Sequence, residues 1–173
     1  MSLRSDLEKV SGEFWQNGFV SVRPVKTQAD LVYAAYECRL TDAQKEMVNP
    51  GWFSIGRAYL FPEDNYPCVI ENERKEPIGF ISLCKWLGSG DAYSWSYFID
   101  VDHQGKGYGK QTALLAIQIF QAANPAKPIK LATEAVNTKA QRLYLSLGFR
   151  KLPEMDGDDL VFGLFPGTES VGG

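Results

Sequence analysis

Residues 98–110 read Phe-Ile-Asp-Val-Asp-His-Gln-Gly-Lys-Gly-Tyr-Gly-Lys. The apolar start predicts the end of a buried strand, three glycines follow within five positions, and a helical pattern then begins at residue 108. Glycines let the backbone approach a ligand closely and leave N–H groups free, and a helix start adds partial positive charge. The stretch therefore predicts a strand–loop–helix unit that binds a polyphosphate.

The flanking sequence predicts alternating strands and helices. Helical spacing predicts helices at residues 27–40, 108–122 and 138–147, a short helix capped by Thr41, and a weaker helix within residues 4–17. Residues 49–66 are rich in Gly, Pro and aromatic side chains, which predicts a long irregular segment near a binding site. Apolar runs and alternation predict strands at residues 19–23, 68–71, 78–86, 92–101, 129–134 and 160–164. This order predicts one mixed α/β domain over residues 19–166, between an N-terminal extension (1–18) and a flexible tail (167–173).

Composition narrows the functional classes. The chain has 173 residues and a net charge of −3, so it lacks the basic surface that nonspecific nucleic-acid binding needs. No apolar run reaches the length of a membrane span and no signal peptide opens the chain, which predicts a cytoplasmic protein without membrane contact. Cys38, Cys68 and Cys84 have no paired spacing, so neither a disulfide framework nor a metal site is expected.

The glycine loop fails two common phosphate-binding patterns. A Walker A loop needs Gly at position 104 and Ser or Thr at 111, where this chain has Gln in both places. A dinucleotide fingerprint beginning at Gly105 needs a third glycine where Lys110 stands. The pattern that fits is Gln-x-x-Gly-x-Gly, and it resembles the pyrophosphate-binding motif of the GNAT superfamily of N-acetyltransferases. The resemblance implies acetyl-CoA as the cofactor, held by backbone N–H groups of Gln104, Gly105, Lys106, Gly107, Tyr108, Gly109 and Lys110.

A second motif follows downstream in the order typical of that superfamily. After the strand at residues 129–134 come Asn137 and then Ala-x-x-Leu-Tyr-x-x-x-Gly-Phe at residues 140–149. The resemblance implies that Asn137 contacts the CoA arm and that Tyr144 protonates the departing sulfur. Without the resemblance, Asn137 is a helix cap, and Tyr144 belongs to an i, i+3, i+4, i+7 core stripe.

The resemblance also implies the architecture and the rest of the catalytic arrangement. It implies an α/β fold with a mixed, mostly antiparallel sheet of six to seven strands, flanked by about four helices, in which a splayed strand pair forms the acetyl-CoA cleft. The thioester would lie along Phe98 and Ile99, where a bulge frees backbone N–H groups, and the Ile99 N–H would bind the thioester carbonyl. Glu134 is the first candidate for the base that deprotonates the amine, with Glu37, Asp100 or a water molecule as alternatives.

The sequence indicates less about the acceptor amine than about the acetyl donor. The sequence around residues 95–109 is similar to the polyamine acetyltransferases of bacteria, although Ser96 stands where a longer polar side chain is expected. Carboxylates near the last predicted hairpin would attract a polycation, or are ordinary turn residues: Glu154, Asp156, Asp158 and Asp159. Aromatic side chains would line the acceptor pocket, or cover the core: Trp52, Phe53 and Tyr59. A small-molecule primary amine is the expected substrate; acetylation of protein or peptide amines and a non-catalytic acyl-CoA sensor are the alternatives, and a homodimer is compatible with the resemblance.

Overall fold

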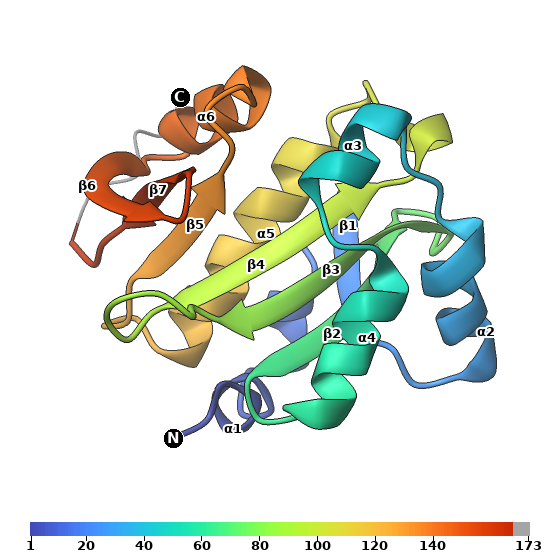
Figure 1. The fold of residues 1–173 in the computed structure, drawn as a ribbon. Helices are drawn as coiled ribbons and strands as arrows, with labels where there is room; N and C mark the ends of the chain where they lie inside the picture. The colour runs from blue at the N-terminus through green and yellow to red at the C-terminus, as the bar shows by residue number, and fades with distance from the viewer. Residues whose placement is uncertain (168–173) are drawn as a thin grey trace.

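A computed structural model describes residues 1–167, which form a seven-stranded sheet with helices on both faces (Figure 1). The strand order is β1-β2-β3-β4-β5-β7-β6, and every neighbouring pair is antiparallel except β4 and β5. The predicted mixed, mostly antiparallel α/β sheet is therefore confirmed. The strands are β1 (Val20–Pro24), β2 (Asn65–Asn72), β3 (Pro77–Lys85), β4 (Tyr93–Ile99), β5 (Ile129–Thr133), β6 (Arg150–Asp156) and β7 (Asp159–Leu164).

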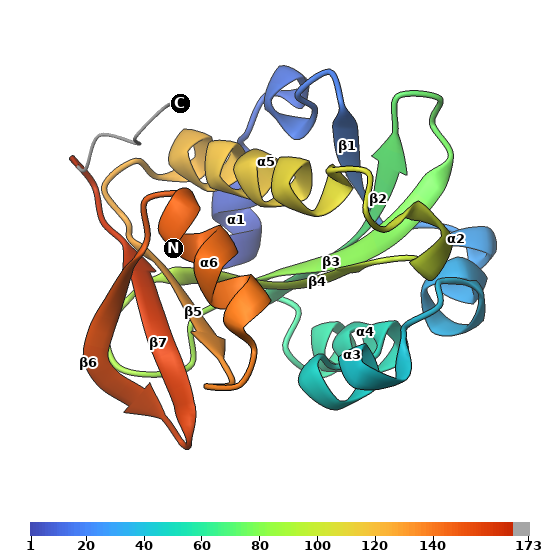
Figure 2. The same ribbon diagram turned by 90° about the horizontal axis from the view of Figure 1, so that it is seen from above.

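The helices form two layers around this sheet. Figure 2 shows α1 and α5 over one face, with α2, α3 and α4 over the other, and α6 lies on the α5 side next to β5. Residues 1–167 contain six α-helices and three further helical turns, of which the predicted flanking helices form the larger part. The α-helices are α1 (Leu3–Leu7), α2 (Gln28–Val32), α3 (Asp42–Met47), α4 (Gly51–Leu60), α5 (Tyr108–Ala123) and α6 (Thr138–Ser146).

Capping side chains explain where two of the short helices begin. Thr27 and Asp30 form a reciprocal capping box at α2, and Thr41 with Gln44 does the same at α3, as the sequence predicted for Thr41. The predicted helix over residues 27–40 is wrong in its second half. A π-helical turn over Tyr33–Glu37 follows α2, and residues 38–40 leave the helix altogether.

The predicted irregular segment at residues 49–66 is also wrong, because most of it forms α4. The helix begins directly after Pro50, and its first residue, Gly51, packs against the backbone carbonyl of Ala34. A Cβ at position 51 would overlap that carbonyl. Glycine lowers helix propensity, but at this position it is what allows α4 to pack against Ala34. The stabilising contact is tertiary, and local propensity therefore missed the helix.

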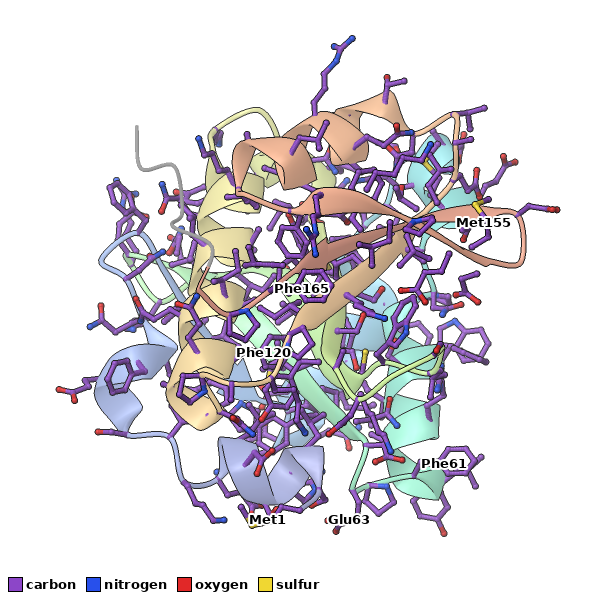
Figure 3. The ribbon with its side chains drawn as sticks, turned by 90° about the vertical axis from the view of Figure 1, so that its left-hand side faces the viewer. Met1, Phe61, Glu63, Phe120, Met155 and Phe165 are labelled. Atoms are coloured by element: carbon purple, nitrogen blue, oxygen red, sulfur yellow. The ribbon has the colours of Figure 1, made fainter. Side chains whose placement is uncertain are left out.

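The core lies chiefly between the sheet and α5. Phe120 of α5 stacks on the Tyr93 ring at a centroid distance of 4.5 Å, and Figure 3 shows Phe120 inside the molecule between helix and sheet. Leu3 and Leu7 of α1 are buried in the same core. The predicted helix within residues 4–17 is wrong beyond Leu7, since only a 3₁₀ turn at Gly12–Trp15 follows it.

Within residues 1–167, no helix has both the length and the apolar character that crossing a bilayer requires. The last predicted hairpin is confirmed as β6 and β7, which turn at residues 156–159. All of the predicted C-terminal tail except Gly167 lies outside the described residues.

Candidate active site

The glycine loop connects β4 to α5 and presents free backbone N–H groups. Gly105 has φ +75° and Gly107, the N-cap of α5, has φ +86°, so both require the left-handed region that glycine adopts without strain. A Cβ at either position would meet no atom within 4 Å, which means that the backbone conformation and not protein packing requires glycine here. No backbone N–H group from Gln104 to Lys110 donates to another part of residues 1–167.

These features fit a pyrophosphate group. The N–H groups point from an open loop at the start of a helix of 16 residues, where the helix dipole favours an anion. The side chains of Lys106 and Lys110 are exposed and make no ion pair with the residues described. The loop therefore combines free donors, open space and two unpaired cations.

The side chain of Gln104 holds the loop against the end of β4. Its amide donates to the Ile99 carbonyl at 2.8 Å and to Oε1 of Gln44 at 2.9 Å. The sequence assigned Gln104 only a backbone role, and it missed Gln44 because the two residues are 60 positions apart. Gln44 thus joins the cap of α3 to the glycine loop.

Strands β4 and β5 diverge next to this loop. They pair at a single position, Tyr93↔Ile129, so the rest of β4 has no partner on that side, which confirms the predicted splayed pair. The expected bulge is absent from the β3–β4 ladder, whose register runs without a shift from Tyr93 to Ile99. The Asp100 N–H donates to Ile78 of β3, so by strand alternation the Ile99 N–H points away from β3 toward the open edge. The divergence of β4 and β5, and not a bulge, leaves this N–H free.

Tyr144 on α6 is half-buried, and its hydroxyl has no hydrogen-bond partner among the described residues. Its ring packs on Phe149 and Phe162, at centroid distances of 5.8 and 5.9 Å, so the core role considered from the sequence is real. Burial raises the pKa of Tyr144 to about 12, which keeps the phenol protonated at neutral pH.

Tyr97 of β4 is a neighbour of Tyr144 that sequence reasoning missed. Its hydroxyl donates to the carbonyl of Gly109 at 2.8 Å, which ties the first turn of α5 to the strand. Burial raises the pKa of Tyr97 above its usual value, and the nearby phenol of Tyr144 adds to the shift. The two tyrosines therefore lie close together, one fastened to the glycine loop and the other with a free hydroxyl.

Asn137 caps α6 as predicted, with its side-chain oxygen accepting from the Ala140 N–H at 3.2 Å. Its side-chain NH₂ group has no partner within the described chain, which leaves a donor for a ligand. Glu134 directly follows β5, and its carboxylate also makes no hydrogen bond or ion pair there, whereas its carbonyl accepts from the Asn137 N–H.

The alternative bases are placed differently. Asp100 is 6% exposed and accepts from the backbone N–H groups of Arg39 and Asp102, so it serves as a structural anchor at the end of β4. Glu37 is exposed at the end of the π-helical turn. Glu134 lies at the end of β5, where β5 has diverged from β4.

A pocket of about 450 Å³ lies beside Phe98, on the face of the sheet opposite to α5. Of the three aromatic residues predicted to line an acceptor pocket or to cover the core, Trp52 lines this pocket, whereas Phe53 and Tyr59 do not. Burial raises the pKa of the Cys38 thiol, also in the lining, to about 12, which argues against a thiolate nucleophile. The full lining is Ala34, Ala35, Tyr36, Cys38, Arg39, Leu40, Lys45, Pro50, Gly51, Trp52 and Phe98.

A larger pocket of about 560 Å³ lies at the other end of β4, around Tyr93 and Trp86, and contains none of the predicted site residues.

The carboxylates of the β6–β7 hairpin are only partly available to a cationic ligand. Glu154 pairs with Lys130 at 2.6 Å, whereas Asp156 and Asp158 are exposed and make no ion pair with described residues.

Comparison with known proteins agrees with this geometry. The sequence profile described as "Acetyltransferase (GNAT) family" matches residues 31–149. The L-amino acid N-acyltransferase MnaT of Escherichia coli is 30% identical over 102 residues, which are 57% of this chain and 58% of that protein. The chain thus matches less than two thirds of this curated relative.

Solved structures show the same fold at low sequence identity. RimJ of Mycobacterium smegmatis, solved in complex with CoA-disulfide, superposes with a TM-score of 0.64 at 22% identity, over 84% of this chain and 81% of that one. The spermidine N-acetyltransferase SpeG of Vibrio cholerae gives 0.66 at 17% identity, over 86% and 95% of the two chains. At these identities the likeness concerns the fold.

Proposed function

The chain belongs to the acetyltransferase (GNAT) family, and we propose that it transfers an acetyl group from acetyl-CoA directly to a primary amine of a small molecule. The observation that carries this proposal is the meeting of three features at one end of β4. These are the glycine loop with free N–H groups, the open strand edge at Ile99, and the unpartnered hydroxyl of Tyr144 near Tyr97.

The glycine loop and its flanking cations would hold the cofactor. Backbone N–H groups of residues 104–110 would bind the pyrophosphate, assisted by Lys106 and Lys110, and the free NH₂ group of Asn137 would contact the pantetheine arm. Bound acetyl-CoA supplies an acetyl group activated as a thioester. The Ile99 N–H would donate to the oxygen on which negative charge develops during transfer.

The proton transfers fall to two side chains. An alkyl ammonium has a pKa of about 10, so forming its neutral amine costs about 4 kcal/mol at pH 7. Glu134 would remove this proton directly or through water. Tyr144 would give its proton to the departing sulfur, since its phenol is protonated at neutral pH.

Polyamines are one acceptor class to test. The exposed carboxylates of Asp156 and Asp158 support it, because such groups would attract a polycation, and SpeG is described as acting on spermidine. The pairing of Glu154 with Lys130 argues against a larger acidic surface. The alternatives are acetylation of protein or peptide amines and acyl-CoA binding without turnover.

The test is release of free CoA from acetyl-CoA, followed with a thiol-reactive chromophore, against a panel of polyamines, amino acids, aminoglycosides and peptides. Turnover of at least one amine, with the acetylated product identified by mass spectrometry, is expected. Tight binding of acetyl-CoA without turnover of any amine would favour the sensor alternative instead. The predicted homodimer and cytoplasmic location have their own tests in light scattering and cell fractionation.

A further inference from the structure

The pocket beside Phe98 has an unusual combination of charges for a polyamine site. Among its lining residues the charged side chains are those of Arg39 and Lys45, and no Asp or Glu lines it. A polycation in the pocket would face these two cations directly, because the carboxylates that pair with them, those of Asp42, Asp100 and Asp102, lie outside the lining. An acceptor with a negative group would find two cations.

The guanidinium of Arg39 is held in place through one of its three nitrogen atoms, Nη2. Its backbone N–H donates to Oδ2 of buried Asp100 at 2.7 Å, and its Nη2 contacts the carboxylates of Asp102 and Asp100, the latter at 3.7 Å. Within residues 1–167, Nε and Nη1 of Arg39 have no partner. The side chain is 56% exposed, so these donors are accessible, and a guanidinium binds a carboxylate well because it presents parallel N–H groups.

Lys45 is the second cation of the pocket and is only weakly engaged. Its ammonium group lies 3.2 Å from Asp42, three positions earlier on α3, and both side chains are exposed. Pairs of this kind contribute little, so a carboxylate ligand competes readily for Lys45.

The remaining lining is apolar or aromatic. Trp52 is 59% exposed, and its ring meets Phe53 edge-on at a centroid distance of 6.0 Å. Phe98, Ala34 and Pro50 add further apolar surface. An apolar or aromatic side chain of a ligand would lie against Trp52, since aromatic rings offer a large contact area.

We infer that this pocket recognises acceptor amines that carry a carboxylate and an apolar side chain, of which an aromatic α-amino acid is the simplest, with Arg39 as the carboxylate-binding residue. The inference rests on the proposed function, because it places the acceptor next to Phe98, one residue from the Ile99 N–H at the open edge. It names a carboxylated amine in preference to a polyamine for this position.

The first experiment compares L-phenylalanine with phenethylamine, which lacks only the carboxylate, and with spermidine. L-Phenylalanine is expected to have the highest kcat/KM of the three. Arg39→Gln should lower kcat/KM for L-phenylalanine roughly 10- to 100-fold and change that for phenethylamine less than about threefold, because a charge-assisted bond is lost only with the first. Lys45 is exposed, and Lys45→Gln should lower kcat/KM for L-phenylalanine as well, by less than Arg39→Gln does but by at least roughly threefold. Lys151→Gln removes an exposed cation outside the pocket and is the matched control.

A binding measurement makes the result independent of turnover. Calorimetry should show N-acetyl-L-phenylalanine binding to the wild-type protein and at least tenfold weaker binding to the Arg39→Gln variant. Binding of this kind without any turnover would support the pocket assignment and contradict the proposed function. Turnover that favours phenethylamine or spermidine, or an equal loss with all amines in Arg39→Gln, would overturn the inference and leave the acetyltransferase proposal standing. Absence of both binding and turnover would overturn both.

Discussion

Tyr144→Phe removes one oxygen atom and separates the two roles of this side chain. The aromatic contacts with Phe149 and Phe162 survive in phenylalanine, and the lost hydroxyl has no hydrogen bond to the described residues. The free energy of unfolding should therefore change by less than about 0.5 kcal/mol. General acids contribute roughly 10²- to 10⁴-fold to rates, and a thiolate with an ordinary pKa near ~8.5 is a fair leaving group, so we expect kcat to fall by roughly 10²-fold.

Three measurements check this expectation. Urea unfolding followed by fluorescence reports stability, calorimetry reports acetyl-CoA affinity, and CoA release reports kcat. Tyr59→Phe is the control, since Tyr59 is 84% exposed and neither stability nor rate should change. The reasoning is refuted if kcat stays within threefold of wild type, because another donor then protonates the sulfur. It is equally refuted if stability falls together with kcat, because packing then explains both.

Three further predictions concern the loop and the response to pH. Gly107→Ala places a side chain at φ +86°, so it should destabilise the fold by about 1 kcal/mol in urea unfolding and weaken acetyl-CoA binding in calorimetry. Asp30 is buried, and its bond to Arg23 holds the pKa of its carboxyl well below the usual range. The stability that ionised Asp30 contributes is thus complete above the unfolded-state pKa of about 4 and is lost as pH falls below it. In Asp30→Asn, the free energy of unfolding should therefore depend less on pH in the acid range. Burial raises the pKa values of Tyr97 and Tyr144, the latter to about 12, so stability should be complete below pH ~10 and decline between pH 10 and 12; a flat alkaline curve would contradict these shifts.

Local sequence signals predicted the parts of this protein that local physics determines. Thr41 and Asn137 were recognisable as caps because a side-chain oxygen satisfies N–H groups two or three residues further on. Gly105 and Gly107 were recognisable because positive φ angles just before a helix are adopted without strain mainly by glycine.

Long-range contacts decided the elements that the sequence failed to predict. α4 contains two glycines and several aromatic residues, and it is stabilised by packing on Ala34, a residue of another helical segment. The π-helical turn at Tyr33–Glu37 contains about one more residue per turn than an α-helix does, and no spacing of apolar residues indicates it. Both segments border the pocket beside Phe98, so the surroundings of this pocket were harder to predict than the glycine loop.

The sequence by itself determined the donor side, since the glycine loop, its helix and the Asn137–Tyr144 motif are each encoded within a few adjacent residues. Only the tertiary structure decided how these parts meet. It replaced the expected bulge with two strands that pair at one position, and it linked Gln104 to Gln44 and Tyr97 to the carbonyl of Gly109. It also placed Arg39 and Lys45 in one pocket with Trp52, because helices that pack on the same face of the sheet (Figure 2) bring together residues that no periodicity relates.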